Sequence, residues 1–290
     1  MTLAPDRPIL LADDDDPSVL TLVDRGLAFD LTTLTRRDLL RALGFGGVSA
    51  GLFTIAGCSP SAVATSSPSA SAAASSGSGA SCAVIPEETA GPFPGDGSNG
   101  PDVLSQSGVV RADIRSSFGS STSVAQGVPL TIKLAIQDAT DCAPIRGAAV
   151  YLWHCDRDGN YSLYSQAAVD ENYLRGVQEA DADGVVSFSS VFPACYPGRW
   201  PHIHFEVYPS LSQAIDQSNK IATSQVALPK DVCDQVYATD GYAQSIQNLS
   251  HVSLTSDMVF RDDGAARQLG TISGSVASGL TVELTVPVGA

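Results

Sequence analysis

The sequence predicts an all-β fold for residues 82–290: a β-sandwich of two mainly antiparallel sheets with long loops. Three observations lead to this prediction. Short stretches of alternating apolar and polar residues recur along this part of the chain, turn-forming Asp-Gly and Pro-Gly pairs separate them, and no long stretch has the apolar period of a helix. About 200 residues are enough for such a sandwich to bury a sizeable core.

The strands are predicted from alternation, which is clearest at residues 130–136, where every second residue is Leu or Ile. Further strands are expected, in chain order, at 149–154, 185–192, 203–208, 221–228 and 280–286. An acidic segment, residues 179–184, matches the first half of a calcium-binding EF-hand loop. However, Ser190 stands where that loop needs a bidentate glutamate, so we expect a hairpin turn there.

Residues 1–57 are predicted to be a signal segment that precedes the fold. Arg36 and Arg37 stand before an uncharged run, residues 42–57, which is shorter than the ~20 residues of a permanent membrane span. This order is typical of a twin-arginine export signal. The run ends in Ile-Ala-Gly-Cys58, which resembles a lipobox in which the cysteine is acylated. We therefore expect an exported lipoprotein at the outer face of the cytoplasmic membrane.

Residues 58–81 are predicted to be a flexible tether between that anchor and the domain. They consist almost entirely of serine, alanine and glycine, with a single valine as the one larger apolar side chain. Such a segment cannot bury enough apolar surface to offset the entropy that ordering would cost. The membrane is thus expected as a partner through the lipid anchor alone.

The charge balance argues against a nucleic-acid partner. The chain has 16 basic and 31 acidic residues and a net charge of −15. Binding to phosphates requires a basic face, so we interpret the excess of carboxylates as a solvated acidic surface.

The stretch CYPGRWPHIHF, residues 195–205, is the candidate site. On a strand His202 and His204 would point to the same side, so they could hold a metal together, although two hydrogen-bonded or surface histidines are the alternative. The candidate oxygen donors are Tyr196, six residues before His202, and Tyr161, in the segment Asp-Gly-Asn-Tyr-Ser. A phenolate becomes a ligand only when the ion displaces a proton with a pKa of ~10. Fe(III), a hard and highly charged ion, is able to do this.

Three segments together resemble the intradiol ring-cleavage dioxygenases, a family that includes protocatechuate 3,4-dioxygenase and catechol 1,2-dioxygenase. They are YLWHCDRDGNYS (151–162), YLRGVQ (173–178) and CYPGRWPHIHF (195–205), and the resemblance covers roughly residues 82–260. It implies a non-haem Fe(III) cofactor held by Tyr161, Tyr196, His202 and His204. Tyr196 resembles the axial ligand that the substrate displaces.

The resemblance also implies a reaction. A catechol binds the metal as a dianion and displaces Tyr196, which takes a substrate proton. O₂ then cleaves the bond between the two hydroxyl-bearing carbons to give a muconate-type diacid, with the metal acting as a Lewis acid on the ring. Arg199 resembles the arginine that stabilises negative charge on the substrate. Gln225 resembles a pocket glutamine, and residues 89–93 resemble the segment that lines the mouth of the pocket.

The six cysteines, at positions 58, 82, 142, 155, 195 and 233, form no C-x-x-C pair, which argues against a zinc ribbon or a thioredoxin-type site. With Cys58 acylated, five remain in an oxidising compartment, and an odd number leaves at least one free. We expect a disulfide between Cys195 and Cys233, because it would fix the Tyr196 loop. Cys82 with Cys142 is the second possible pair, and His154 is expected to be structural.

Two other functions stay open from the sequence. A non-enzymatic β-sandwich binding module at the cell surface would not need to retain both tyrosines, and a zinc hydrolase would need a carboxylate or a third histidine. Catechol or a substituted catechol is favoured over protocatechuate, because no second basic residue obviously stands ready for a substrate carboxylate. No helical dimerisation segment of the catechol 1,2-dioxygenase kind is evident, so the sequence favours no particular oligomeric state.

Overall fold

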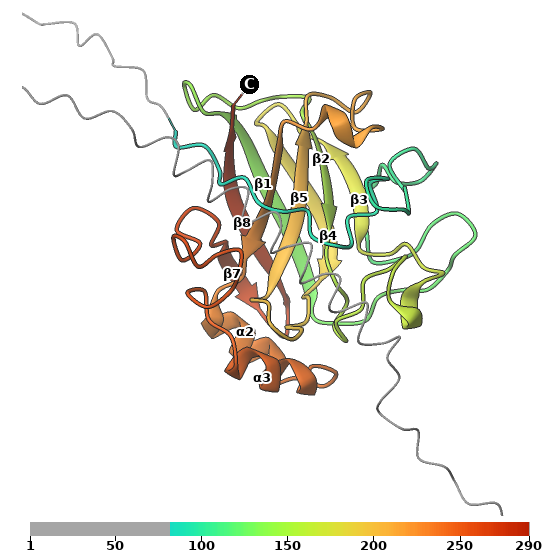
Figure 1. The fold of residues 1–290 in the computed structure, drawn as a ribbon, viewed down its shortest axis with the longest axis vertical. Helices are drawn as coiled ribbons and strands as arrows, with labels where there is room; N and C mark the ends of the chain where they lie inside the picture. The colour runs from blue at the N-terminus through green and yellow to red at the C-terminus, as the bar shows by residue number, and fades with distance from the viewer. Residues whose placement is uncertain (1–81, 290) are drawn as a thin grey trace, which may run out of the picture.

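The computed structural model describes residues 82–289, which form a β-sandwich (Figure 1). The predicted signal segment, the tether and Cys58 lie outside these residues. Within them no helix is both long and apolar enough to cross a membrane. The elements are β1 (Pro129–Asp138), β2 (Ala149–Trp153), the 3₁₀ turn η1 (Gln166–Ala168), β3 (Arg175–Glu179), β4 (Val185–Val191), β5 (His202–Tyr208), the 3₁₀ turn η2 (Gln217–Asn219), β6 (Ala222–Ala227), α2 (Lys230–Tyr237), α3 (Ala243–Ser250), β7 (Thr271–Ser275) and β8 (Gly279–Val288).

Two four-stranded sheets make up the sandwich. Their strand orders are β4–β1–β8–β7 and β3–β2–β5–β6. Neighbouring strands are antiparallel except β1 and β8, which run parallel from Leu130↔Leu280 to Asp138↔Val288. The predicted all-β sandwich with mainly antiparallel sheets is therefore confirmed.

The alternation of β1 builds the core between the sheets. Its Leu and Ile side chains are buried, and they pack in one cluster with apolar residues of β2 and β5, among them Val150, Ile203 and Phe205. Burying such side chains stabilises the fold by about 1.5–3 kcal/mol each relative to exposure. Helices α2 and α3 contribute Cys233, Val236 and Leu249 to the same cluster, and they lie together at one end of the sandwich (Figure 1).

The second sheet is buried on its outer face as well. All seven residues of β5 are buried. Ile203, Phe205 and Val207 belong to the core cluster. His202 and His204 alternate with them along the strand, so they lie on the other side of the sheet. There Trp153 and Tyr151 of β2 pack in a second apolar cluster with residues of the loops that precede and follow the strands of this sheet. This covered outer face carries the candidate site.

The strands β3 and β7 and the helices α2 and α3 were not predicted from the sequence. The acidic turn is also different from the prediction. Asp181 closes it by accepting the N–H groups of Asp183 and Val185 at 2.9 Å each, but the turn joins β3 in one sheet to β4 in the other, so it is not a hairpin. Gly184 has φ +75°, and a Cβ there would lie 2.6 Å from the Ile136 carbonyl oxygen. The change of sheet therefore depends on glycine at this position.

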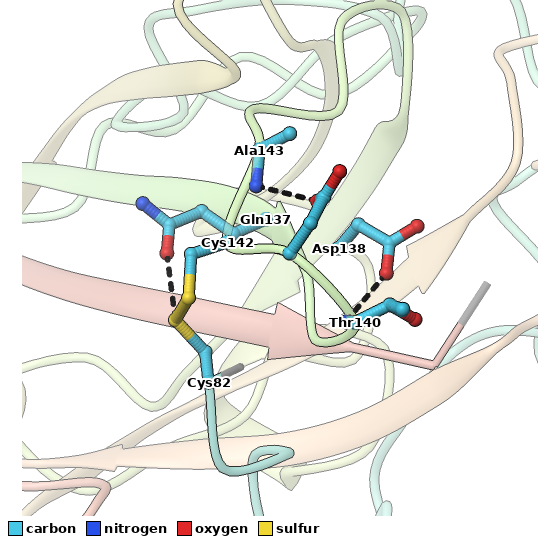
Figure 2. Close-up of a disulfide and its surroundings, with 7 residues drawn as sticks. Cys82, Gln137, Asp138, Thr140, Cys142 and Ala143 are labelled. Carbon is cyan, nitrogen blue, oxygen red and sulfur yellow. Dashed lines mark hydrogen bonds between the residues drawn. A yellow bond between two sulfur atoms is a disulfide. The ribbon is translucent and has the colours of Figure 1, made fainter. Parts of the chain in front are cut away.

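A disulfide joins Cys82 to Cys142 (Figure 2). Cys142 lies in the turn after β1, where the backbone N–H of Thr140 donates to Asp138 at 2.7 Å and that of Ala143 donates to Asp141 at 2.9 Å. From Cys82 the chain crosses both sheets, because Ile85 N–H donates to Pro287 of β8 and Glu88 N–H donates to Thr223 of β6. The bond therefore anchors the beginning of the domain.

The prediction of a Cys195–Cys233 disulfide is wrong. Both cysteines are buried free thiols, as is Cys155. Cys195 Sγ contacts the carbonyl oxygen of Arg199 at 3.5 Å, whereas Cys233 Sγ contacts that of Leu228 at 3.9 Å. Hydrogen bonds from α3, described below, hold the Tyr196 loop instead.

Candidate active site

The four predicted donor residues meet at one point. His202 and His204 come from β5, Tyr161 from the loop after β2, and Tyr196 from the loop before β5. His202 Nε2 lies 3.0 Å from His204 Nε2, 3.2 Å from Tyr196 Oη and 3.5 Å from Tyr161 Oη. The two phenol oxygens are 3.5 Å apart. Two nitrogen and two oxygen atoms thus converge from three segments of the chain.

These separations fit ligands of a single metal ion. Donor atoms bound to one ion at about 2.0–2.2 Å and at roughly right angles lie about 3 Å apart. The His202 ring is also oriented for this role, because its Nδ1–H donates to the Trp200 carbonyl at 2.5 Å and leaves the Nε2 lone pair for the centre. The His204 ring stacks on Trp153, with ring centroids 4.9 Å apart and planes inclined by 7°. The residues present therefore fit a mononuclear metal site.

Burial favours the neutral forms of the donor side chains. It lowers the pKa of His202 and His204 well below the usual histidine value, so both are neutral imidazoles with a free lone pair. It raises the pKa of Tyr161 well above the usual range, and the neighbouring Tyr196 raises it further. Because a phenolate is disfavoured in this dry place on its own, the donor set requires a strongly charged cation to hold it ionised.

A tight loop fixes Tyr161. The Asp156 carboxylate accepts the backbone N–H groups of Asp158 and Asn160 at 2.9 and 2.8 Å and the phenol of Tyr173 at 3.0 Å. Tyr161 N–H donates to Ser165 Oγ at 2.9 Å. The Tyr161 side chain is 2% exposed, and its ring packs on Phe93 with centroids 4.9 Å apart. Both ends of the side chain are thus held.

Tyr196 is less enclosed. It is half-buried and is followed by the exposed residues Pro197 and Gly198. Helix α3 anchors the base of this loop, since Cys195 N–H donates to Ser245 Oγ at 3.0 Å and the Asn248 side-chain amide donates to the Cys195 carbonyl at 2.8 Å. The loop is therefore fixed before the tyrosine and open after it.

Arg199 and Gln225 lie side by side next to the donors. Arg199 Nη2 donates to Gln225 Oε1 at 2.7 Å, and Gln225 stands opposite His204 in the β5–β6 ladder. The Gln225 amide in turn donates to the Thr89 carbonyl at 2.9 Å, which brings the predicted mouth segment to the site. In the same segment, a Cβ at Gly91 would lie 3.3 Å from His204 Cε1.

Sequence reasoning missed Asp257. Its carboxylate is fully buried, and Oδ2 accepts both Arg199 Nε at 2.9 Å and Trp200 N–H at 2.6 Å. The same residue thus positions the arginine and the backbone that orients His202. The one available signal was Asp257 as a lone acid before the apolar pair Val259-Phe260, whose N–H groups its Oδ1 accepts. That pattern indicates a turn, but it does not indicate that Asp257 binds Arg199 and Trp200.

The remaining histidine and carboxylate candidates are otherwise engaged. His154 is buried, with its ring nitrogens 2.8 Å from the Cys155 carbonyl and 2.7 Å from Ser190 Oγ, as expected for a structural histidine. Among residues 82–289, no three or more His, Cys, Asp or Glu residues gather as a metal site. Glu206, two residues beyond His204, binds Lys220 and Tyr208 instead. The zinc hydrolase hypothesis thus finds no third ligand of its expected kind in the described part of the chain.

Comparisons with known proteins find similarity to dioxygenases. A family model described as Dioxygenase matches residues 100–216, which include all four donors and Arg199. A chlorocatechol 1,2-dioxygenase from Rhodococcus opacus is 42% identical over 57 residues, or 20% of this chain; the match spans 22% of that protein, about a fifth of its length.

Two solved structures are similar. An intradiol ring-cleavage dioxygenase from Tetranychus urticae is 23% identical, with 72% of this chain and 95% of that chain covered and a TM-score of 0.55. The dioxygenase domain of a dioxygenase–carbohydrate-binding fusion from Streptomyces sp. SirexAA-E is 20% identical, with 72% and 99% covered and a TM-score of 0.46.

The described residues have the fold of the Tetranychus urticae dioxygenase, and the Dioxygenase family model matches residues 100–216, less than half of the chain. Both findings are in line with the resemblance carried by the three sequence segments.

Proposed function

We propose that the protein is a non-haem Fe(III) intradiol dioxygenase that cleaves the bond between the two hydroxyl-bearing carbons of a catechol to give a muconate-type diacid. The observation that carries this proposal is that one imidazole nitrogen and two phenol oxygens lie within 3.5 Å of His202 Nε2. When bound by these four residues, Fe(III) would supply a Lewis acid that activates the aromatic diol toward O₂.

Tyr196 is the residue that makes room for the diol. It is half-buried, whereas Tyr161 is held at both ends, so Tyr196 would move aside at the lower cost. Its Oη would then take one proton from a catechol hydroxyl and become a neutral phenol. Tyr161, His202 and His204 would hold the metal throughout.

Arg199 stabilises the negative charge that builds on the substrate ring. Its side chain is 7% exposed, and its guanidinium is held by Asp257 and Gln225. A fixed cation costs no reorganisation when the charge develops, and its effect is strong where water is excluded. Gln225 positions it through the bond to Nη2.

The protein is also proposed to act outside the cytoplasmic membrane. The arginine pair at 36–37, the uncharged run that follows and Cys58 support export and acylation, and residues 58–81 would hold the domain at a distance from the lipid surface. Twin-arginine export agrees with a domain that takes up its metal before it crosses the membrane.

The test is the product formed from catechol under ¹⁸O₂ by the iron-loaded protein. We expect a muconate-type diacid that carries both labelled atoms, and no product from His204→Ala. His251→Ala, which removes an exposed histidine, should behave as the parent. A catechol that binds without O₂ consumption would instead indicate a binding module, and cleavage beside the diol would contradict the assigned chemistry.

A further inference from the structure

Arg175, the first residue of β3, is a buried cation that the proposed chemistry does not use. It is 1% exposed. Its guanidinium donates all of its N–H groups: Nε to Ser162 Oγ at 3.0 Å, Nη1 to the Pro94 carbonyl at 2.6 Å and the Tyr151 hydroxyl at 3.0 Å, and Nη2 to the carbonyls of Phe93 and Ser162 at 2.9 Å each. Every acceptor is a neutral oxygen. Arginine is rarely buried to this degree, and hydrogen bonds from a charged donor are stronger than those between neutral groups, so these partners are firmly held.

The arginine stands in the same row of the sheet as a donor histidine. Arg175, Trp153, His204 and Gln225 are opposite one another across β3, β2, β5 and β6. Directly opposite residues of antiparallel strands point to the same face, so Arg175 lies on the covered outer face with the site. Trp153, whose ring stacks on His204, stands between the two. Arg175 is thus placed to act on the surroundings of the donors and not on the metal itself.

On one side the guanidinium holds the loop that carries Tyr161 (residues 154–165, the Tyr161 loop). Ser162 directly follows the ligand tyrosine, and both its hydroxyl and its carbonyl oxygen accept from Arg175. The same hydroxyl donates to the Tyr173 carbonyl at 2.7 Å, so it is oriented to receive the Arg175 Nε–H. The backbone that leaves Tyr161 is therefore fixed by the arginine.

On the other side the guanidinium holds residues 93–95 at the end of the mouth segment (the 93–95 segment). It binds the carbonyls of Phe93 and Pro94, and the Phe93 ring packs on the ring of Tyr161. Gly95 makes this close approach possible, because it has φ +67° and a Cβ there would lie 2.8 Å from Arg175 Nη1. The ligand tyrosine is thus held through its own loop and through the residue that packs on it, by one side chain.

We propose that Arg175 is a positioning residue that couples the Tyr161 loop to the 93–95 segment, so that one guanidinium sets both a metal ligand and the wall of the substrate pocket. This inference rests on the proposed dioxygenase function and adds a positioning residue to it. Displacement of either segment breaks bonds to the same rigid fork, so the two segments keep one relative position. A lysine keeps the charge but has three donors on a single nitrogen, and it cannot reproduce the fork.

The first experiment compares Arg175→Lys with Arg111→Lys in iron-loaded protein. Arg111 is the matched control because it also donates to backbone carbonyls, those of Arg175, Asn172 and Ser116, which lie in neither segment. Arg175→Lys should bind Fe(III) about tenfold to a hundredfold more weakly, as for loss of a group that orients a metal ligand, and its tyrosinate absorption band should shift. Arg111→Lys should keep the parental affinity and band. Parental values in Arg175→Lys would overturn the inference and mark the arginine as a support of the fold alone.

The second experiment measures the coupling without iron, by amide hydrogen exchange of the full chain in peptides that cover residues 93–97 and 161–165. Gly95 N–H donates to the Tyr164 hydroxyl at 2.8 Å, and Ser165 N–H donates to the Tyr161 carbonyl at 2.9 Å. In Arg175→Lys both peptides should exchange about tenfold faster, the factor for loss of one hydrogen bond, and in Arg111→Lys neither should change. Faster exchange in only one peptide, or in neither, would overturn the coupling.

Tyr151→Phe is a milder change to the same contact, because the Tyr151 hydroxyl accepts from Arg175 and donates to the Pro94 carbonyl at 2.7 Å. It takes the place of Arg175→Lys if that variant does not fold. It should then show the same two effects at smaller size, and parental iron affinity and exchange would overturn the inference. If the parent cleaves no catechol, the proposed function fails, and the exchange experiment decides the coupling separately.

Discussion

Trp200 and Trp153 orient the two donor histidines from different directions. The Trp200 carbonyl accepts the Nδ1–H of His202, and the Trp153 ring lies flat on His204. Asp257 then fixes the Trp200 backbone through its N–H. The Trp200 carbonyl thus determines which nitrogen of His202 faces the centre, whereas stacking fixes the plane of the His204 ring.

Arg199→Ala should leave the metal content and the visible spectrum nearly unchanged. It should lower kcat by raising the activation free energy by about 2–4 kcal/mol, because one preorganised group that stabilises charge is lost. Arg199→Lys should recover little, since a single ammonium cannot serve Asp257 and Gln225 together. Arg115→Ala, at an exposed pair with Asp113, is the matched control. Loss of the metal from Arg199→Ala would show that the arginine supports the ligand loop.

Single residues could be predicted where the chemistry lies in a short stretch of sequence. His202 and His204 share a strand face, and Tyr196 and Arg199 lie within six residues of His202, so this stretch suggested a site, while the role of each residue came from the family resemblance. Asp257 is 58 residues from Arg199, and nothing local marks it as a partner.

At the scale of elements, α3 does what a disulfide was expected to do. It holds both polar backbone groups of Cys195 through Ser245 and Asn248, so the loop that carries Tyr196 begins from a fixed point. The two hydrogen bonds to α3 position the Cys195 backbone. The thiols of Cys195 and Cys233 are free.

Asn248→Ala should loosen the Tyr196 loop. It leaves the buried Cys195 carbonyl without its donor, so the free energy of unfolding should fall by about 1–3 kcal/mol. The tyrosinate absorption band should broaden as Tyr196 becomes less ordered. Gln247→Ala, on the exposed side of the same helix, should change neither by a comparable amount. Identical unfolding curves and spectra for the two variants would exclude α3 as the anchor of the loop.

The strands that the sequence predicted have either alternation, as in β1, or a continuous apolar run, as in β2. β3 escaped prediction because its sequence RGVQE contains a buried arginine and Gly176, where a Cβ would meet Ile114 Cγ2 at 2.6 Å. Its register is thus set by close packing and not by apolar periodicity. β7 is an exposed edge strand of Ser, Thr and Gly around one Ile. The helices α2 and α3 have eight residues each, too few turns for a helical period to stand out.

At the scale of the whole molecule, the Cys82–Cys142 disulfide anchors the beginning of the domain. It closes a separation of 60 residues, for which the loss of unfolded-state entropy corresponds to about 4 kcal/mol. Replacing both cysteines by serine should lower the free energy of unfolding in denaturant by a similar amount, and reductant should then have no further effect on the variant.

Peptide mapping without reduction checks the same pairing directly. We expect a linked peptide pair that contains Cys82 and Cys142, together with Cys155, Cys195 and Cys233 as thiols that alkylate only after denaturation, since all three are buried. A linked pair that contains Cys195 and Cys233 would contradict the structure and restore the expectation drawn from the sequence.

Anchoring through Cys58 is a separate prediction for the whole chain. Cys58→Ala should move the exported protein from the membrane fraction to the soluble fraction, because the proposed acylation site is gone. Replacing Arg36 and Arg37 by lysine should instead retain the protein in the cytoplasm. Continued sedimentation of Cys58→Ala with membranes would mean that the anchor lies elsewhere.

The most direct test of the four-donor site is the iron content and visible spectrum of Tyr161→Phe beside Tyr196→Phe, with O₂ uptake on a catechol measured for each. Tyr161 is enclosed and stays bound throughout, so its loss should cost most of the iron and most of the tyrosinate colour. Tyr196→Phe should retain iron with a shifted band from the one remaining phenolate, still bind catechol, and turn over slowly for want of the departing base. Equal iron retention and equal activity in the two variants would contradict the site and the dioxygenase function proposed from it.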